Sequence, residues 1–241
     1  MRPHATHAPT HPLTYDAQPA TLRGRPVQAV FFDLDGTLVE TDDETVARLA
    51  RRLAPLRPLL PRRDVARCAR HLAGWINDHF NGGLAVLDWL HLDRPAQRLF
   101  RRWGLIHENS PDHPLTPVAG TVELVRALYG RYLLGIVSTR SEAEVQVYLA
   151  QHGLAGCFAT VVGYDSTVRI KPHAQPIRWA ASQLGVSLRN VVMVGDTAAD
   201  VRAAHSAGAL AVGVLCGFGD RADLRRADLV LASTADLAEW L

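Results

Sequence analysis

The chain has 241 residues, 48% of them hydrophobic, and can bury the core of one large domain or of one domain with an insertion. Its formal net charge of +2 reflects nearly balanced acids and bases, which argues against nucleic acid or an anionic membrane as a partner. The longest apolar run, residues 209–216, is far shorter than the ~20 residues of a membrane-spanning helix. A soluble protein is expected.

The three cysteines Cys68, Cys157 and Cys216 are odd in number and show no CxxC spacing. This pattern argues against a disulfide framework or a zinc site and favours a reducing, cytoplasmic compartment. No apolar segment of the kind found in secretory signals opens the chain. The sequence carries no signal for an oligomeric state.

Residues 1–25 are rich in proline and show neither helical nor strand periodicity, so they are predicted to form a flexible tail. The tail contains His4, His7 and His11. Metal capture by these histidines is an alternative to a solvated, unstructured segment, and the unstructured segment is favoured.

Residues 27–34 form a β-branched and aromatic run that is typical of a strand buried on both faces, and Gly36 breaks it. On a strand, Asp33 and Asp35 point to the same side about 6 to 7 Å apart, because side chains alternate at a rise of ~3.3 Å per residue. A divalent cation, or one ionised and one protonated carboxyl, would relieve the repulsion between them. A plain strand followed by an Asp-Gly turn is the alternative, and it needs nothing from Asp33.

Residues 42–114 contain helical patterns and no credible strand, so this stretch is predicted to be an all-helical insertion. A capping box at residues 41–44 starts the first helix, and a second helix is predicted over residues 64–80. The arginine pairs of the insertion are typical of solvated helix faces.

From residue 117 onward, predicted helices and strands alternate. The helices are expected over residues 121–129, 142–152, 175–184 and 198–207, and the strands over residues 132–138, 159–162, 190–194, 211–215 and 229–231. Such alternation predicts parallel βα units in one layered sheet, with residues 27–34 as a central strand. Residues 26–41 and 115–241 are therefore expected to form an α/β core.

Polar residues gather where these strands end, which is where functional sites lie in such sheets. Lys171, the single lysine among 26 basic residues, lies in a loop that belongs to the same edge. Several carboxylates, a hydroxyl pair and one compact ammonium suit a divalent cation together with a phosphate-like anion. The candidate residues are Asp33, Asp35, Ser138, Thr139, Lys171, Asp196 and Asp200.

Four short motifs occur in order: Asp33-Leu34-Asp35-Gly36-Thr37, Ser138, Lys171-Pro172, and Gly195-Asp196 with Asp200. In this ordered set the chain resembles the haloacid dehalogenase superfamily phosphohydrolases over about residues 27–235. The resemblance implies a Rossmann-like parallel sheet core with an inserted all-helical cap, since residues 42–114 are similar to the small cap of the phosphoglycolate phosphatase-like branch.

The resemblance also implies a role for each motif residue. Asp33 is the expected nucleophile, which forms an aspartyl phosphate, and Asp35 the general acid and base. Mg²⁺ is expected on Asp33, Asp196 and the backbone carbonyl of Asp35, with Asp200 orienting a metal-bound water or Lys171. The expected phosphate-binding residues are Gly36, Thr37, Ser138, Thr139 and Lys171.

These roles predict a Mg²⁺-dependent phosphatase acting on a small phosphorylated metabolite, with 2-phosphoglycolate as the best single substrate. Asp35 disfavours dehalogenation, a reaction with no leaving alkoxide to protonate. Glu40, Thr139-Arg140 and His173 depart from the residues most common in relatives, and such positions can line the substrate pocket. Two alternatives keep the same site: a sugar phosphomutase and a non-catalytic phosphate-binding regulator.

Overall fold

The computed structural model describes residues 20–40, 49–59, 65–66, 68–69 and 115–241. They contain a six-stranded parallel sheet in the order β5-β4-β3-β6-β7-β8, which confirms the predicted α/β core. The strands are β3 (Ala29–Phe32), β4 (Leu133–Val137), β5 (Thr160–Val162), β6 (Val191–Gly195), β7 (Leu210–Val214) and β8 (Leu229–Leu231).

Helices connect the strands from β3 to β7 as the alternation predicted, and a loop without a helix connects β7 to β8. The helices are α4 (Thr121–Leu128), α5 (Glu142–Gln151), α6 (Gln175–Leu184) and α7 (Ala198–Ala207), together with the 3₁₀ turns η3 (Leu188–Asn190) and η4 (Thr234–Glu239). The bounds of α6 and α7 agree with the prediction, and α4 and α5 each end one residue earlier. The η4 turn was not predicted.

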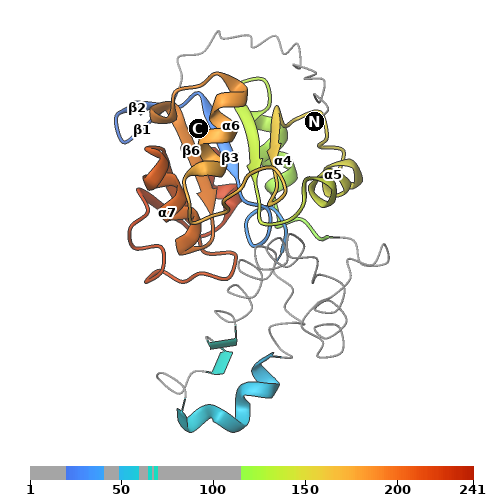
Figure 1. The fold of residues 1–241 in the computed structure, drawn as a ribbon, viewed down its shortest axis with the longest axis vertical. Helices are drawn as coiled ribbons and strands as arrows, with labels where there is room; N and C mark the ends of the chain where they lie inside the picture. Colours follow the sequence, from blue (N-terminus) through green and yellow to red (C-terminus); the bar gives the residue numbers. More distant parts are fainter. Residues whose placement is uncertain (1–19, 41–48, 60–64, 67, 70–114) are drawn as a thin grey trace.

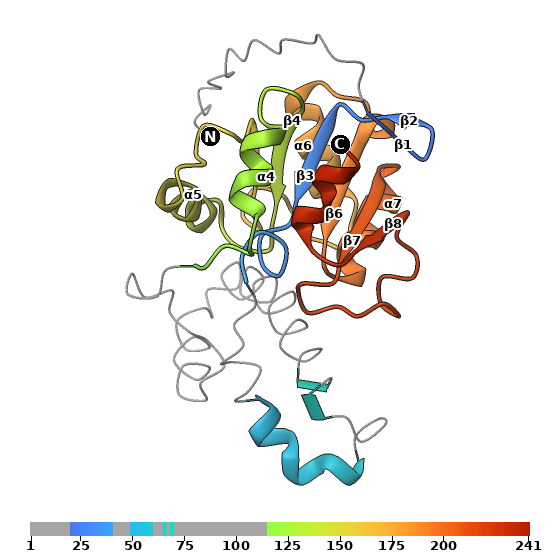
Figure 2. The ribbon, with the colours of Figure 1, turned by 180° about the vertical axis from the view of Figure 1, so that it is seen from behind.

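The central strand β3 is buried on both faces, as its continuous apolar run predicted. Val30 and Phe32 belong to the core layer shared with α4 and α5, whereas Ala29 and Phe31 face the layer of α6 and α7. Figure 1 shows α6 and α7 in front of the sheet, and Figure 2 shows α4 and the C-terminal turn on the opposite face. Because helices cover both faces of the sheet, a site is expected at the carboxyl ends of the strands.

Two helices begin with capping boxes that fix their first turns. At α5 the pair is Ser141 and Glu144, and at α7 it is Thr197 and Asp200. Each side chain accepts a hydrogen bond from the backbone N–H of the other residue, so two otherwise unpaired donors are satisfied. The cap of α7 therefore holds a candidate site residue, Asp200, in a defined position.

The expectation that the flexible tail extends to residue 25 is wrong for its last residues. Strands β1 (Thr21–Leu22) and β2 (Arg25–Pro26) form an antiparallel hairpin, and the Arg25 guanidinium donates to the carbonyl of Arg189 at 2.6 Å and to that of Gly208 at 2.9 Å. Strands of two residues are too short to show a periodicity, and these bonds reach residues far along the chain. Residues 1–19 lie outside the described residues.

The predicted insertion lies mostly outside the described residues. Residues 49–53 are helical and continue into η1 (Ala54–Leu59). Leu49 and Ala69 are buried together, and the ring of Phe218 from the core packs against them. No helix among the described residues is long and apolar enough to cross a membrane.

Gly135 on β4 gives a test of the central packing. It pairs with Phe31, and a Cβ at this position would lie 2.8 Å from Phe31 Cδ1 and 2.9 Å from Thr160 Cγ2. Gly135→Ala should therefore lower the free energy of unfolding by about 1–3 kcal/mol through overpacking. Urea denaturation measures this loss.

The matched control for that substitution is Gly156→Ala, because a Cβ there meets nothing within 4 Å. Its free energy of unfolding should stay within about 0.5 kcal/mol of the parent protein. Equal stabilities for the two variants would contradict the close packing of β4 against β3 and β5.

Candidate active site

The loop after β3 carries the two aspartates of the first motif. The strand ends at Phe32, so Asp33 and Asp35 lie beyond it, and the expectation that they project from one side of a strand is wrong. The turn needs Gly36, whose φ of +72° lies in the left-handed region. The carbonyl of Leu34 closes the turn by accepting from later backbone N–H groups of the loop. The carboxylates are thus positioned by a tight turn rather than by strand pleating.

The register of the sheet places Asp33 beside Asp196. Phe32 on β3 pairs with Val194 on β6, and the Asp33 N–H donates to the Val194 carbonyl at 2.9 Å. Both aspartates follow directly from the carboxyl ends of these neighbouring parallel strands. Adjacent strand ends therefore bring together residues that are far apart in the sequence, as expected for a site in an α/β sheet.

Lys171 lies between two of the aspartates. Its Nζ is 2.7 Å from Asp33 Oδ1 and 2.8 Å from Asp200 Oδ1, and its side chain is 3% exposed. Burial lowers the pKa of Lys171, but the attraction of Asp200 and Asp33 outweighs burial, so the pKa lies above its usual value. The lysine is therefore a fixed positive charge inside the site.

Burial also raises the pKa of Asp33, and the positive charge of Lys171 only partly opposes this rise. Desolvation raises the pKa of Asp33 to about 8; Lys171 opposes this rise, and the neighbouring Asp200 and Asp35 charges add to it. A further cation near Asp33 would favour its ionised form. The charges around Asp33 therefore favour the binding of a cation.

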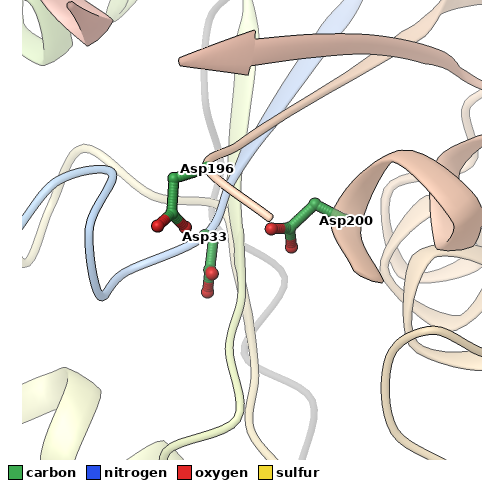
Figure 3. Close-up of side chains that lie close together, drawn as sticks. All are labelled: Asp33, Asp196 and Asp200. Carbon is green, nitrogen blue, oxygen red and sulfur yellow. The ribbon is translucent and has the colours of Figure 1, made fainter. Parts of the chain in front are cut away.

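Within the described residues, one group of acidic side chains has the geometry of a metal site: Asp33, Asp196 and Asp200. One carboxylate oxygen from each residue lies within 4.8 Å of the other two, and all three residues are buried. Figure 3 shows the three side chains close together. An oxygen-only donor set of this kind suits a hard divalent cation. The buried triad therefore fits a metal ion.

The hydrogen bonds of Asp200 distinguish it from the other two aspartates. Its Oδ1 accepts from Lys171, and its Oδ2 accepts from the Thr197 N–H at 3.0 Å and the Thr197 hydroxyl at 2.6 Å. Both oxygens are thus occupied by the helix cap and the lysine. Asp200 is placed to orient Lys171, whereas Asp33 and Asp196 are better placed to hold a cation directly.

The loop after β7 also supports the site, and the sequence analysis missed it. The Phe218 N–H donates to Asp196 Oδ2 at 2.6 Å. A Cβ on Gly217 would overlap the same oxygen, and a Cβ on Gly219 would overlap the Asp196 carbonyl oxygen. Glycine at both positions allows the backbone to approach the carboxylate closely. Two glycines just after a strand end were the available signal.

Asp35 is held by a residue that the motif analysis assigned no role. Arg140 Nη2 donates to Asp35 Oδ1 at 2.7 Å and its Nε to Oδ2 at 2.8 Å, a two-bond contact with both carboxylate oxygens. Burial lowers the pKa of Arg140, but the attraction of Asp35 outweighs burial and raises the pKa above its usual value. The guanidinium is thus a second fixed positive charge at this edge.

The second motif lies on the same edge. Ser138 and Thr139 follow β4 and are buried, and the Ser138 hydroxyl accepts from the Arg140 N–H at 3.1 Å. From the first motif, the Thr37 hydroxyl is buried and has no hydrogen-bond partner among the described residues. Buried polar groups usually have a partner, so this hydroxyl fits a site that receives a polar ligand.

The structure therefore brings the predicted residues to one edge of the sheet. Lys171 contacts Asp33 and Asp200 directly, Asp196 lies in the same acidic cluster, and Arg140 links Asp35 to Ser138. The chemical roles of these residues remain predictions.

Comparison with known proteins gives consistent matches. A family model described as haloacid dehalogenase-like hydrolase matches residues 30–214. The chain is 31% identical over 232 residues to a phosphoglycolate phosphatase of Neisseria meningitidis, across 89% of this chain and 94% of the relative. It is 29% identical over 189 residues to the pyrophosphatase PpaX of Listeria monocytogenes, across 78% of this chain and 83% of the relative.

A solved structure shows the same fold. It is described as a predicted phosphoglycolate phosphatase from Haemophilus somnus and superposes with a TM-score of 0.60 at 22% identity. The superposition covers 88% of this chain and 97% of that chain. At this identity the likeness concerns the fold alone.

Replacing the buried lysine should destabilise the protein. Lys171→Met leaves Asp33 and Asp200 facing each other without their shared cation, and breaking a buried ion pair in this way costs about 3–5 kcal/mol. Urea denaturation at neutral pH measures the loss. Millimolar MgCl₂ should restore part of it, because a cation bound by the remaining carboxylates stabilises the folded state.

The control is Arg202→Met on the exposed surface of α7, which removes a positive charge away from the site. Its free energy of unfolding should change by less than about 0.5 kcal/mol. Equal losses in the two variants would contradict the buried position of Lys171 between the aspartates.

The loop after β7 can be tested separately. In Gly217→Ala the new Cβ would overlap Asp196 Oδ2, so the carboxylate has to turn away from the Phe218 amide. Calorimetric titration with Mg²⁺ should show affinity at least about 10-fold weaker, the size of effect expected when a group that orients a metal ligand is lost. Gly156→Ala, with open space around its Cβ, should bind Mg²⁺ as the parent protein does.

Proposed function

The chain belongs to the haloacid dehalogenase-like hydrolase family, in its phosphoglycolate phosphatase-like branch, and we propose that it hydrolyses a small phosphomonoester with Mg²⁺ as cofactor. The observation that carries the proposal is the buried cluster of Asp33, Asp196 and Asp200 with Lys171 inside it. Its cysteines are free thiols, as in proteins of a reducing compartment, and we place the enzyme in the cytoplasm.

In the proposed reaction, a carboxylate oxygen of Asp33 attacks the phosphorus atom while the bond from phosphorus to the ester oxygen breaks. Asp35 gives its proton to the departing alkoxide, so the alcohol leaves neutral. Asp35 then takes a proton from water as the water oxygen attacks the aspartyl phosphate. This step releases inorganic phosphate and restores the Asp33 carboxylate.

The phosphoryl oxygens require positive charge and hydrogen-bond donors. Lys171 supplies a buried positive charge 2.7 Å from Asp33 Oδ1, next to the proposed nucleophile. Ser138 and Thr37 offer buried hydroxyls, and Gly36 and Thr139 lie in the same two loops. We propose that these five residues bind the phosphoryl group.

The buried triad supports a metal ion as part of this site. Asp33 and Asp196 would hold it, together with the backbone carbonyl of Asp35, as the family resemblance implies. When bound, Mg²⁺ neutralises charge on the phosphoryl oxygens and keeps the nucleophile ionised. Asp200 orients Lys171 through their 2.8 Å ion pair. In this proposal the aspartate triad has two functions: two members bind the cation and the third positions the lysine.

The substrate is proposed from the relatives' names. One is a phosphoglycolate phosphatase and the other a pyrophosphatase, and the named substrates share a second anionic group beside the phosphoryl group that is removed. We propose 2-phosphoglycolate as the best single substrate. Residues 42–114 are proposed to be the cap over the site, with residues 26–41 and 115–241 as the core, and the packing of Phe218 against Leu49 and Ala69 supports this division.

A substrate panel tests the proposal. Purified protein with Mg²⁺ should release inorganic phosphate from 2-phosphoglycolate, and EDTA should abolish the release. Isomerised sugar phosphate without release of phosphate would instead indicate a phosphomutase. Binding of a phosphoryl mimic with no turnover on any phosphomonoester would indicate a non-catalytic regulator.

Asp33→Asn should abolish turnover, because an amide cannot act as the nucleophile. We expect kcat to fall at least about 1,000-fold, with no phosphoenzyme trapped after acid quenching of labelled substrate. The control is Glu239→Gln at the exposed end of η4, which also replaces a carboxylate by an amide and should keep the parent rate. A labelled phosphoenzyme in Asp33→Asn would assign the nucleophile to another residue.

A further inference from the structure

The contact between Arg140 and Asp35 conflicts with the role proposed for Asp35. The guanidinium donates to both carboxylate oxygens, at 2.7 Å to Oδ1 and 2.8 Å to Oδ2. A general acid and base has to form a hydrogen bond first to the ester oxygen and then to water. Asp35 therefore has to leave this two-bond contact before it can act.

The position of Arg140 indicates what can replace Asp35. The residue lies in the loop after β4, where its own N–H donates to the Ser138 hydroxyl and its carbonyl accepts from the Tyr164 N–H at 3.0 Å. Its backbone is thus fixed inside the proposed phosphate site, whereas its side chain keeps 15% of its surface exposed. A ligand bound at this edge lies within reach of the guanidinium.

Glu144 lies too far from the guanidinium to take the place of Asp35. Glu144 Oε1 is 3.9 Å from Nη1, beyond hydrogen-bond distance, and its side chain is 39% exposed. If Asp35 leaves without replacement, a largely buried guanidinium loses its two-bond partner, and such a loss is costly. An uncharged ligand cannot offset that cost, but a carboxylate can, because it replaces one singly charged planar anion by another.

We propose that Arg140 is the binding residue for a carboxylate on the substrate, and that this binding takes the guanidinium from Asp35 and frees Asp35 to take up from water the proton that it then gives to the ester oxygen. The inference rests on the proposed phosphatase function and narrows its substrates to phosphomonoesters that carry a carboxylate near the ester oxygen. The ion pair between Arg140 and Asp35 then holds back turnover of phosphomonoesters that lack such a group.

The kinetic test compares two substrates of similar size, 2-phosphoglycolate and ethylene glycol monophosphate, which has an uncharged hydroxymethyl group in place of the carboxylate. The parent enzyme should prefer 2-phosphoglycolate in kcat/KM. In Arg140→Gln this preference should fall roughly 10- to 100-fold, mainly through a higher KM for 2-phosphoglycolate, as expected for loss of a charge-assisted two-bond contact. Arg140→Lys, which keeps the charge without the planar fork, should retain part of the preference.

Arg226→Gln is the matched control, since it removes an exposed arginine outside the site and should keep the parent preference. Thermal unfolding midpoints identify any variant that is misfolded. If Arg140→Gln does not fold, the substrate preference of Arg140→Lys tests the proposal instead. An unchanged preference in a folded Arg140 variant overturns the proposal. An equal loss of kcat on both substrates also overturns it, because that result indicates a purely structural role.

A binding experiment separates this inference from the proposed function. Isothermal titration with Mg²⁺ present uses two non-hydrolysable probes, phosphonoacetate with a carboxylate and ethylphosphonate without one. The parent protein should bind phosphonoacetate at least about 10-fold more tightly, and Arg140→Gln should lose this difference. If the parent protein binds phosphonoacetate more tightly but hydrolyses no phosphomonoester, the proposed function fails and the carboxylate site at Arg140 is supported. If the parent protein binds the two probes equally, the carboxylate site at Arg140 is overturned and the proposed function is not affected.

Discussion

The site depends on crowded carboxylates kept together in a buried space. Adjacent strands β3 and β6 end side by side, and their register places Asp33 and Asp196 next to each other. Anions at such short distances repel each other, and burying even one uncompensated charge costs several kcal/mol. Lys171, between Asp33 and Asp200, offsets part of this negative charge. The resulting excess of negative charge favours a cation at this end of the sheet, which is the basis of the metal and phosphate sites proposed above.

The close packing of these carboxylates explains why the loops around them have no space for a side chain at several glycines. A Cβ at Gly36 or at Gly217 would overlap Asp196 Oδ2, and a Cβ at Gly195 would overlap the Asp200 carboxyl group. Backbone amides and helix caps hold the carboxylates in orientations that a metal ion can use, and side chains would displace them. These glycines therefore support the site by allowing the backbone to lie close to the acids.

Local sequence patterns predicted much of this arrangement. Apolar runs located the strands, 3.6-residue periodicity located α6 and α7 to the residue, and the rule about strand ends located the site edge. Contacts between distant residues were not predictable in this way: nothing near Arg140 in the sequence indicates that its side chain binds Asp35, 105 residues earlier. The hairpin at β1 and β2 was missed for the same reason, since long-range hydrogen bonds hold it, whereas a local tight turn around Gly36 sets the strand end at Phe32.

Phe218 contacts two parts of the chain that lie far apart in the sequence. Its backbone N–H donates to Asp196 Oδ2, and its ring packs against Leu49 and Ala69 in the stretch that follows the first motif. The ring and the amide belong to one residue, in a loop that Gly217 and Gly219 allow to lie close to Asp196. A single loop residue therefore contacts both a carboxylate of the acidic cluster and the stretch that contains Leu49 and Ala69, and a local sequence pattern indicates neither contact.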